Sequence, residues 1–191
     1  QNLVGNLTIE NLAGDKDVIF KADDGSGGAS TEYFRLDGSS ENVLFSKLIK
    51  LSDNVELRVG DGNDVKIFSD GTDGYISGET GDLYIRQRGD DKDIIFQSDD
   101  GSGGVTAYVT LDGSAGYTVA NKDIYLADDV RLRAGTGGDF SFFHDGSNSK
   151  INNNTGNIRI ENFQDDGDIQ FFTDDGSGGT TEYFRLDGGD T

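Results

Sequence analysis

The chain has 191 residues and a formal net charge of −20, from 36 acidic and 16 basic side chains, and it contains no Cys, Pro, Met or Trp. A surface this negative repels nucleic acid and anionic membranes, so we expect neither as a partner. The lack of cysteine excludes disulfides and thiol chemistry. No apolar run approaches the roughly 18 residues of a membrane span, so we expect no membrane insertion.

The first predicted element, residues 1–38, is the back half of a repeated module. Asp-Asp-Gly-Ser-Gly-Gly occurs three times along the chain, and Leu-Asp-Gly follows each copy, starting at the equally spaced positions Leu36, Leu111 and Leu186. A fixed period indicates an array of one structural unit. We interpret the chain as a piece of a longer array. The expected divisions are 1–38 (the C-terminal half of a truncated module), 39–113 and 114–188 (full modules), and 189–191 (the start of the next unit).

The next elements, in the first full module, are short strands. Val55, Leu57 and Val59 alternate with polar residues, and a period of two is typical of a half-buried strand. Gly, Asp, Asn and Ser separate the runs and favour turns. The pattern predicts an all-β protein without helices. Strand-like runs begin near Val55, Val65, Tyr75, Leu83, Ile94 and Val105.

The second full module repeats this pattern, and each of its strands again carries two or three apolar side chains. Such strands need partners for their faces and edges. We favour an elongated repeat array that forms an intertwined trimeric β-helix or β-prism shaft, because the irregular strand spacing suits strands that leave and rejoin sheets. A single-chain β-helix or β-roll is the alternative. The residues expected to pack against other chains are Val55, Leu57, Phe96, Leu111, Val130, Leu132, Phe171 and Leu186.

One candidate calcium site is the loop around Asp61, Asn63 and Asp64, which resembles the nonapeptide of calcium-binding β-rolls. In the next module Thr136 stands in place of Asp61, and Gly138 in place of Asn63. The glycines and the last aspartate are kept. A turn needs the glycines whereas an ion needs the oxygens, so the comparison favours a turn.

A second candidate calcium site is the Asp-Asp-Gly-Ser-Gly-Gly loop, in which Asp99, Asp100, Asp174 and Asp175 supply the carboxylates of the two full modules. Two adjacent carboxylates in a glycine-rich loop could bind an ion at a trimer axis or edge. The favoured interpretation is a hairpin loop, because Asp-Gly is a strong hairpin sequence. The expected cofactor is therefore none, with calcium as the alternative.

No residue pattern predicts an enzyme. His144 is the only histidine, and Ser69 occupies its place one module earlier, so we expect a turn or surface role for it. Acidic pairs suggest a glycosidase, but 36 acidic residues make chance pairs inevitable and there is no Trp to stack a sugar. Gly135-Thr136-Gly137-Gly138 lacks the lysine and helix of a phosphate loop.

The run 141–160, with Phe143-His144-Asp145-Gly146-Ser147-Asn148-Ser149 and then Thr155-Gly156-Asn157-Ile158, resembles the repeats of tail fibres from marine tailed phages, including cyanophages. The run 174–188 is similar to another segment of the same fibres, and the resemblance covers nearly the whole chain. It implies a homotrimeric, β-rich virion appendage without catalytic residues in its repeats.

The expected function is that of a tail-fibre shaft, which holds a host-binding tip away from the particle. The expected partners are two further copies of the chain and other virion tail proteins, and the expected location is the virion. One alternative is a fibre module that binds host-surface glycans. Another is a calcium-stabilised β-roll adhesin of a bacterial surface or a secreted protein.

Overall fold

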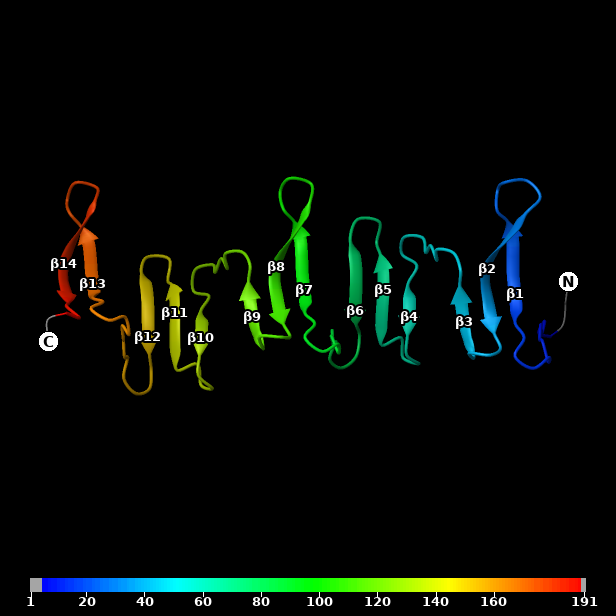
Figure 1. The fold of residues 1–191 in the computed structure, drawn as a ribbon, viewed down its shortest axis with the longest axis horizontal. Helices are drawn as coiled ribbons and strands as arrows, with labels where there is room; N and C mark the ends of the chain where they lie inside the picture. The colour runs from blue at the N-terminus through cyan, green and yellow to red at the C-terminus, as the bar shows by residue number, and fades with distance from the viewer. Residues whose placement is uncertain (1–4, 190–191) are drawn as a thin grey trace. The chain divides into compact units, whose positions relative to one another are not determined.

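A computed structural model describes residues 5–189 of the chain (Figure 1). The fold is all-β: the described part consists of short strands in small antiparallel sheets and contains no helix, as the alternating pattern predicted. It therefore has no helix long and apolar enough to cross a membrane. The chain divides into two compact units, Gln1–Arg86 and Gln87–Thr191, which are described separately.

The first unit contains two sheets, each a meander of three strands that are consecutive in the chain. The first sheet consists of β1 (Val18–Asp23), β2 (Ser30–Asp37) and β3 (Asn42–Phe45). The second consists of β4 (Leu57–Val59), β5 (Val65–Ser69) and β6 (Gly74–Gly78).

The second unit contains two similar meanders and a final hairpin. The first meander consists of β7 (Ile94–Asp99), β8 (Val105–Asp112) and β9 (Tyr117–Ala120). The second consists of β10 (Leu132–Ala134), β11 (Phe140–His144) and β12 (Ser149–Asn153). The hairpin consists of β13 (Ile169–Asp174) and β14 (Thr180–Leu186).

The sequence repeat is also a repeat of secondary structure. The bounds of β4, β5 and β6 recur exactly one period later in β10, β11 and β12. The longer hairpins β1–β2, β7–β8 and β13–β14 each have one register shift, at which an extra tyrosine bulges from the second strand: Tyr33, Tyr108 or Tyr183. Because these tyrosines have the same spacing as the Leu-Asp-Gly copies, the irregularity belongs to the repeated unit. The module boundaries proposed above remain a prediction, and residues 1–4 and 190–191 lie outside the described part.

Strand register collects apolar side chains on one face of each sheet. In the sheet of β7, β8 and β9, Ile94 is opposite Leu111, and Phe96 is opposite Val109. Their neighbours Ile95 and Thr110 pair on the other face, because successive side chains point to opposite faces. In the first and last hairpins the same positions hold stacked phenylalanines with ring centroids 4.3 Å apart, Phe20 on Phe34 and Phe171 on Phe184.

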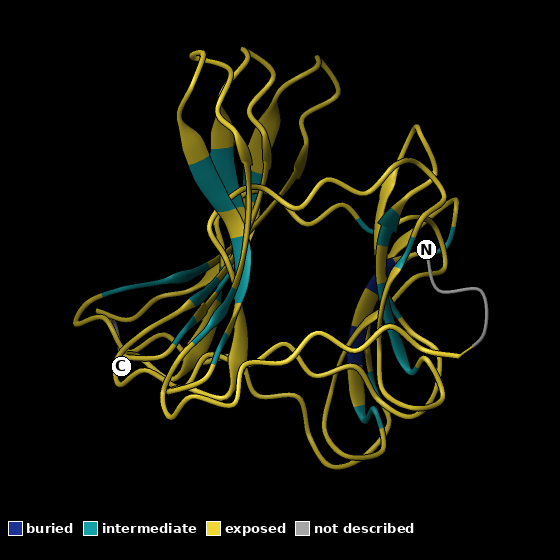
Figure 2. Ribbon diagram, turned by 90° about the vertical axis from the view of Figure 1, so that its right-hand side faces the viewer, coloured by how far each residue is buried: buried dark blue, intermediate teal, exposed yellow. Residues whose placement is uncertain are grey.

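These apolar faces are not covered within either unit. In the described residues only Phe143 (7% exposed) and Ser141 (5% exposed) are buried, and Figure 2 shows the rest of the ribbon as exposed or intermediate. Strand contacts occur between neighbours within a sheet and not between the sheets of a unit. The fold therefore has local hydrogen-bonded order without a hydrophobic core of the usual kind.

The strand expected near Leu83 is not formed within the described single chain. Residues 82–88 are not part of any strand, nor are the corresponding residues 157–163. A strand requires a partner, and in the described chain no neighbour pairs with these runs, although their alternation is that of a strand.

Strand pairing also bears on the single-chain alternative. Every strand pair in the described residues is antiparallel. A single-chain β-helix or β-roll stacks its coils through parallel ladders, so the sheets seen here do not match that alternative.

Candidate functional site

The most extensive candidate site is the set of uncovered apolar faces. All eight residues expected to pack against other chains are exposed, by 40 to 61%. They are Val55, Leu57, Phe96, Leu111, Val130, Leu132, Phe171 and Leu186. None of them is covered by its own chain, so these faces are free to contact another molecule.

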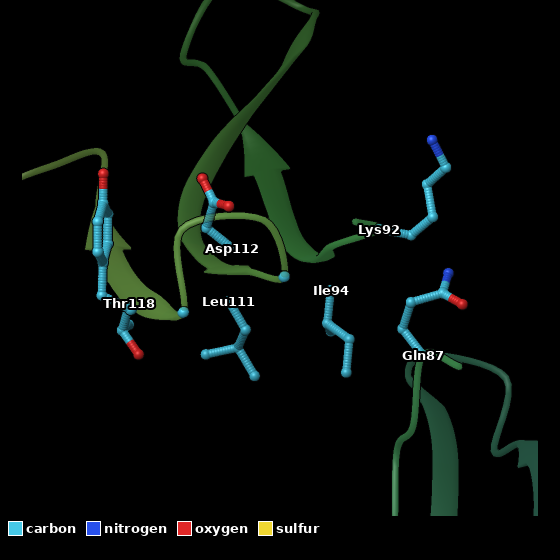
Figure 3. A pocket seen from close by; sticks show the side chains of 9 residues that line it. Gln87, Lys92, Ile94, Leu111, Asp112 and Thr118 are labelled. Carbon is cyan, nitrogen blue, oxygen red and sulfur yellow. The ribbon is translucent and has the colours of Figure 1, made fainter. Parts of the chain in front are cut away.

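A hollow of about 310 Å³ lies over the apolar face of the sheet of β7, β8 and β9. Ile94 and Leu111 project from neighbouring strands into it, and Gln87 and Lys92 lie at one side (Figure 3). A matching hollow of about 270 Å³ in the first unit is lined by the equivalent Val18 and Leu36. The hollows are thus a repeated feature of the module.

A third hollow, of about 490 Å³ and larger than these two, lies at the sheet of β10, β11 and β12. Phe140, Phe142 and Ile151 line it from the sheet, and Ile124 and Leu126 line it from the segment before β10. Its lining is predominantly apolar, so an inserted apolar side chain would fit its chemistry better than an ion or a charged ligand.

The Asp-Asp-Gly-Ser-Gly-Gly loops use their carboxylates internally. Asp100 Oδ1 accepts hydrogen bonds from the backbone N–H groups of Ser102 (2.8 Å) and Gly104 (3.1 Å) and from the Ser102 hydroxyl (2.7 Å). Asp175 does the same with Ser177 and Gly179. The second carboxylate of each pair therefore caps its own loop, within a hairpin of the kind that the sequence predicted.

The first carboxylate of each pair also accepts a hydrogen bond within its own loop. Asp99 Oδ2 accepts the N–H of Gly101 at 2.9 Å, and Asp174 Oδ2 accepts the N–H of Gly176 at 3.1 Å. Hydrogen bonds from Ser102, first its hydroxyl and then its backbone N–H, lower the pKa of Asp100. The same contacts from Ser177 lower the pKa of Asp175. Both loops favour ionised carboxylates without a metal ion being required.

The first copy of this loop is longer by one residue, Ala29. Asp24 Oδ1 still accepts hydrogen bonds from the N–H (2.9 Å) and the hydroxyl of Ser26. The additional bond from a glycine N–H, seen at Asp100 and Asp175, has no counterpart at Asp24 in the described residues. Gly28 has a φ of +101°, whereas the matching Gly104 is not among the glycines with positive φ. The inserted residue thus changes how the loop closes.

The loop of Asp61, Asn63 and Asp64 is a turn between β4 and β5. The N–H of Asn63 donates to the Gly60 carbonyl at 3.0 Å, and Asp64 Oδ1 accepts the Thr80 hydroxyl at 2.8 Å. The side chain of Asp64 lies against Gly60, whose φ is +91° and where a Cβ would clash with the carboxylate. Asp64 therefore joins the turn to the segment that follows β6.

The equivalent positions 63 and 138 carry Asn in one module and Gly in the next, and the reason is conformational. Asn63 has a φ of 57°, and Gly138, its equivalent, has a φ of 68°. Asn and Gly are the residues that adopt this left-handed conformation most readily. The position thus keeps a backbone shape between the modules and not an oxygen ligand.

His144 and Ser69 play the same role in equivalent turns, as expected from their equivalent positions in the two modules. The N–H of Gly71 donates to the Ser69 hydroxyl, and the N–H of Gly146 donates to His144 Nδ1, both at 3.1 Å. His144 Nδ1 also lies 2.9 Å from a carboxylate oxygen of Asp128. Both side chains hold the turn that follows their strand.

Sequence reasoning missed a clamp at the base of the last hairpin. Asp168 Oδ1 accepts the N–H of Gly188 at 3.0 Å, and Asp168 Oδ2 contacts the Arg185 guanidinium at 2.9 Å. Asp17 makes the same contacts with Gly38 and Arg35. The available signal was the recurrence, in each copy of the repeat, of an aspartate before the hairpin and a glycine after it.

The described residues contain no group of three or more His, Cys, Asp or Glu side chains arranged to hold a metal ion. The candidate carboxylates therefore occur as separate pairs in separate loops. No family model matches the chain, and neither a curated protein nor a solved structure is matched to it.

Proposed function

We propose that the chain is a structural segment of a homotrimeric fibre, in which three copies bring their open apolar faces together. The observation that carries the proposal is the large solvent-accessible area of the single chain. Its solvent-accessible area is 15885 Å², whereas a folded monomer of this mass exposes about 8,800 Å².

The excess of about 7,000 Å² per chain is far larger than an ordinary protein contact, which covers about 800 Å² on each partner. Obligate assemblies, which resemble a divided hydrophobic core, bury areas of several thousand Å². The excess is therefore of the size expected for a chain that completes its core only by association.

The repeat supports identical chains as the partners. Each module presents the same type of face, at equivalent residues such as Leu57 and Leu132, and both are about half exposed. Copies related by a closed rotation bring equivalent faces together at every module. Threefold closure follows the resemblance to tail-fibre repeats and places one sheet from each chain around a common axis.

Within this proposal the segment is part of a virion appendage outside the cell, a shaft that separates a host-binding tip from the particle. Other tail proteins would join it at its ends. The role requires length and stiffness, which a stacked repeat supplies, and it requires no catalytic group, cofactor or metal.

The test is the native mass of the segment by size exclusion with light scattering. We expect a mass three times the 20.5 kDa of one chain. A mass of one chain, at concentrations up to about 100 μM, would contradict the proposal, since an interface of this size should persist there.

A matched pair of variants tests whether the apolar face forms the interface. Leu132 is 51% exposed in the single chain, so Leu132→Asp adds no buried charge there, but it would bury three charges together in the trimer and prevent assembly. Asn152→Asp adds the same charge to the opposite face of the same sheet, where Asn152 is opposite Ser141, and should leave the trimer intact. Equal effects of the two variants would contradict the assignment of faces.

A further inference from the structure

Each three-stranded meander, and the last hairpin, is preceded by a segment that has the pattern of a strand but no partner. We call these the connector segments and define them as residues 7–10, 48–51, 82–86, 123–126 and 157–161. None of them is assigned to a strand, helix or turn. They recur with the module: 82–86 corresponds to 157–161, and 48–51 to 123–126.

The backbone of the connector segments makes no hydrogen bonds to the described part of the chain. The backbone bonds outside the sheets involve turns and loop closures, and none involves an N–H or C=O group of these residues. Side chains do not cap them either. Two capping bonds lie close by but outside the segments: the Asn153 amide donates to the Gly156 carbonyl, and the Arg88 N–H donates to the side chain of Gln87. Within residues 5–189, each segment therefore retains backbone donors and acceptors without a partner along its length.

In four of the five segments, all but 48–51, apolar side chains recur at every second position, and most of them are exposed. Leu83 and Ile85, for example, lie on either side of Tyr84, and both are exposed. Leu48, in the segment before β4, is 99% exposed. A free backbone together with an apolar stripe of period two is the combination that an added β-strand requires.

We propose that the connector segments pair as β-strands with the sheet edges of a second copy of this chain. The proposal rests on the proposed homotrimer and specifies how its chains are connected. Each connector segment pairs with the edge of a sheet in a neighbouring chain and not with a sheet of its own chain. The chains would then be intertwined by hydrogen bonds as well as by apolar contacts.

A second copy fits the segments better than an unrelated partner. The meanders present free edges on both sides, because each strand pairs only within its own small sheet. An identical chain has the same repeat period, so all of its edges can meet all of the segments in register. Another protein would need the same period and the same edges to do so.

The hollow at the sheet of β10, β11 and β12 supports the same arrangement. Ile124 and Leu126 belong to a connector segment, and they line this hollow together with Phe140, Phe142 and Ile151 of the adjoining sheet. The segment and the sheet thus present one apolar lining without filling the space between them. Side chains from a neighbouring chain that pairs with the segment would fill it.

Amide hydrogen exchange on the assembled, full-length segment tests the pairing. We expect amides of residues 82–86 and 157–161 to exchange at least about a hundredfold more slowly than in an unstructured peptide, as paired strands do. Gly25 and Gly27, whose N–H groups make no hydrogen bond in the described structure, are the internal control and should exchange at the peptide rate.

The exchange experiment separates the two proposals. Assembly with fast exchange in the connector segments would overturn the strand pairing and leave the trimer standing. A monomer in solution would overturn both proposals. Slow exchange in a trimer would support both.

Proline substitution provides a second test. Proline lacks the N–H and is excluded from paired strands, and N–H groups of successive residues point to opposite sides of a strand. At least one of Tyr84→Pro and Ile85→Pro should therefore lower the trimer fraction at least tenfold relative to the matched alanine variant at the same position. Proline and alanine variants that assemble equally well at both positions would overturn the proposal.

Discussion

Gly113 lies against the backbone of Lys92, so closely that a Cβ on the glycine would lie less than 3.0 Å from the Lys92 carbonyl oxygen. The N–H of Gly113 also donates a hydrogen bond to Asp93 Oδ1 at 3.0 Å. The end of β8 is thereby fixed to the residues that precede β7. Gly38 and Gly188 make the equivalent approaches to Lys16 and Gly167, which explains why Leu-Asp-Gly recurs.

We predict that Gly113→Ala destabilises the protein, because the added methyl group must displace backbone and not a flexible side chain. The expected loss is about 1–3 kcal/mol, the usual range for overpacking. Gly74→Ala is the control, since Gly74 has no atom within 4 Å of the added Cβ and no positive φ. Urea denaturation at one protein concentration would measure the stability of both variants. Equal midpoints for the two variants would show that the close approach is unimportant.

Much of the fold could be predicted because its signals are local. The alternation of Val55, Leu57 and Val59 indicated the strand that the structure shows as β4. Glycine and asparagine marked the turns, and the presence of Gly138 in place of Asn63 favoured a turn at a position where both residues have a positive φ. These inferences need only the neighbouring residues and the comparison between modules.

What could not be predicted depends on partners distant in sequence. The run at Leu83 has the same alternation as a paired strand, yet pairing is decided by the presence of an edge, which no local pattern encodes. The clamp between Asp168 and Arg185 likewise joins residues 17 apart. The sequence predicted hairpin loops at the Asp pairs, but it did not show that Asp100 and Asp175 cap their own loops.

The left-handed position in the β4–β5 turn makes a prediction about Asn63. Asn63→Gly should leave the free energy of unfolding nearly unchanged, because Gly138 already fills the equivalent place with a φ of 68°. Asn63→Val should cost about 1–2 kcal/mol, since branched residues adopt this conformation poorly. Thermal denaturation of the two variants would decide. A larger loss with glycine than with valine would mean that the Asn63 side chain, and not the backbone, is required.

The clamp at Asp168 predicts a pH dependence. The Arg185 guanidinium and then the Gly188 N–H lower the pKa of Asp168 below its usual value of 3.8. A group with a lowered folded pKa stabilises the protein fully above its unfolded pKa and loses that contribution as pH falls through the folded pKa. Asp168→Asn should therefore have a lower Tm than the parent at pH 7, and the difference should shrink as pH falls below about 3.8.

Asp165→Asn is the control for that pH series, because the Asp165 carboxylate accepts no hydrogen bond in the described structure. It removes one charge from the same loop without removing a hydrogen bond, so at pH 7 it should lower the Tm less than Asp168→Asn does. A difference between Asp168→Asn and the parent that stays constant over this range would show that ionisation of Asp168 does not contribute.

Chelation tests the role of the acidic loops. We expect EDTA to leave the Tm and the native mass unchanged, because Asp100 and Asp175 already direct their Oδ1 atoms to N–H and hydroxyl donors of their own loops. Millimolar CaCl₂ should likewise act no differently from NaCl of equal ionic strength. A Tm that rises with calcium and falls with EDTA would favour the β-roll alternative, and Asp61→Asn or Asp100→Asn would then locate the ion.

The charge of the chain predicts how assembly responds to salt. Each copy carries −20, so a trimer carries −60, and repulsion between the chains opposes the apolar attraction. Raising NaCl from about 10 mM to about 150 mM shortens the screening length from about 30 Å to about 8 Å and should increase the trimer fraction. Sedimentation at several salt concentrations would measure it. Dissociation on adding salt would instead mean that ion pairs between chains dominate the interface, since those pairs weaken when screened whereas burial of faces such as that of Leu132 does not.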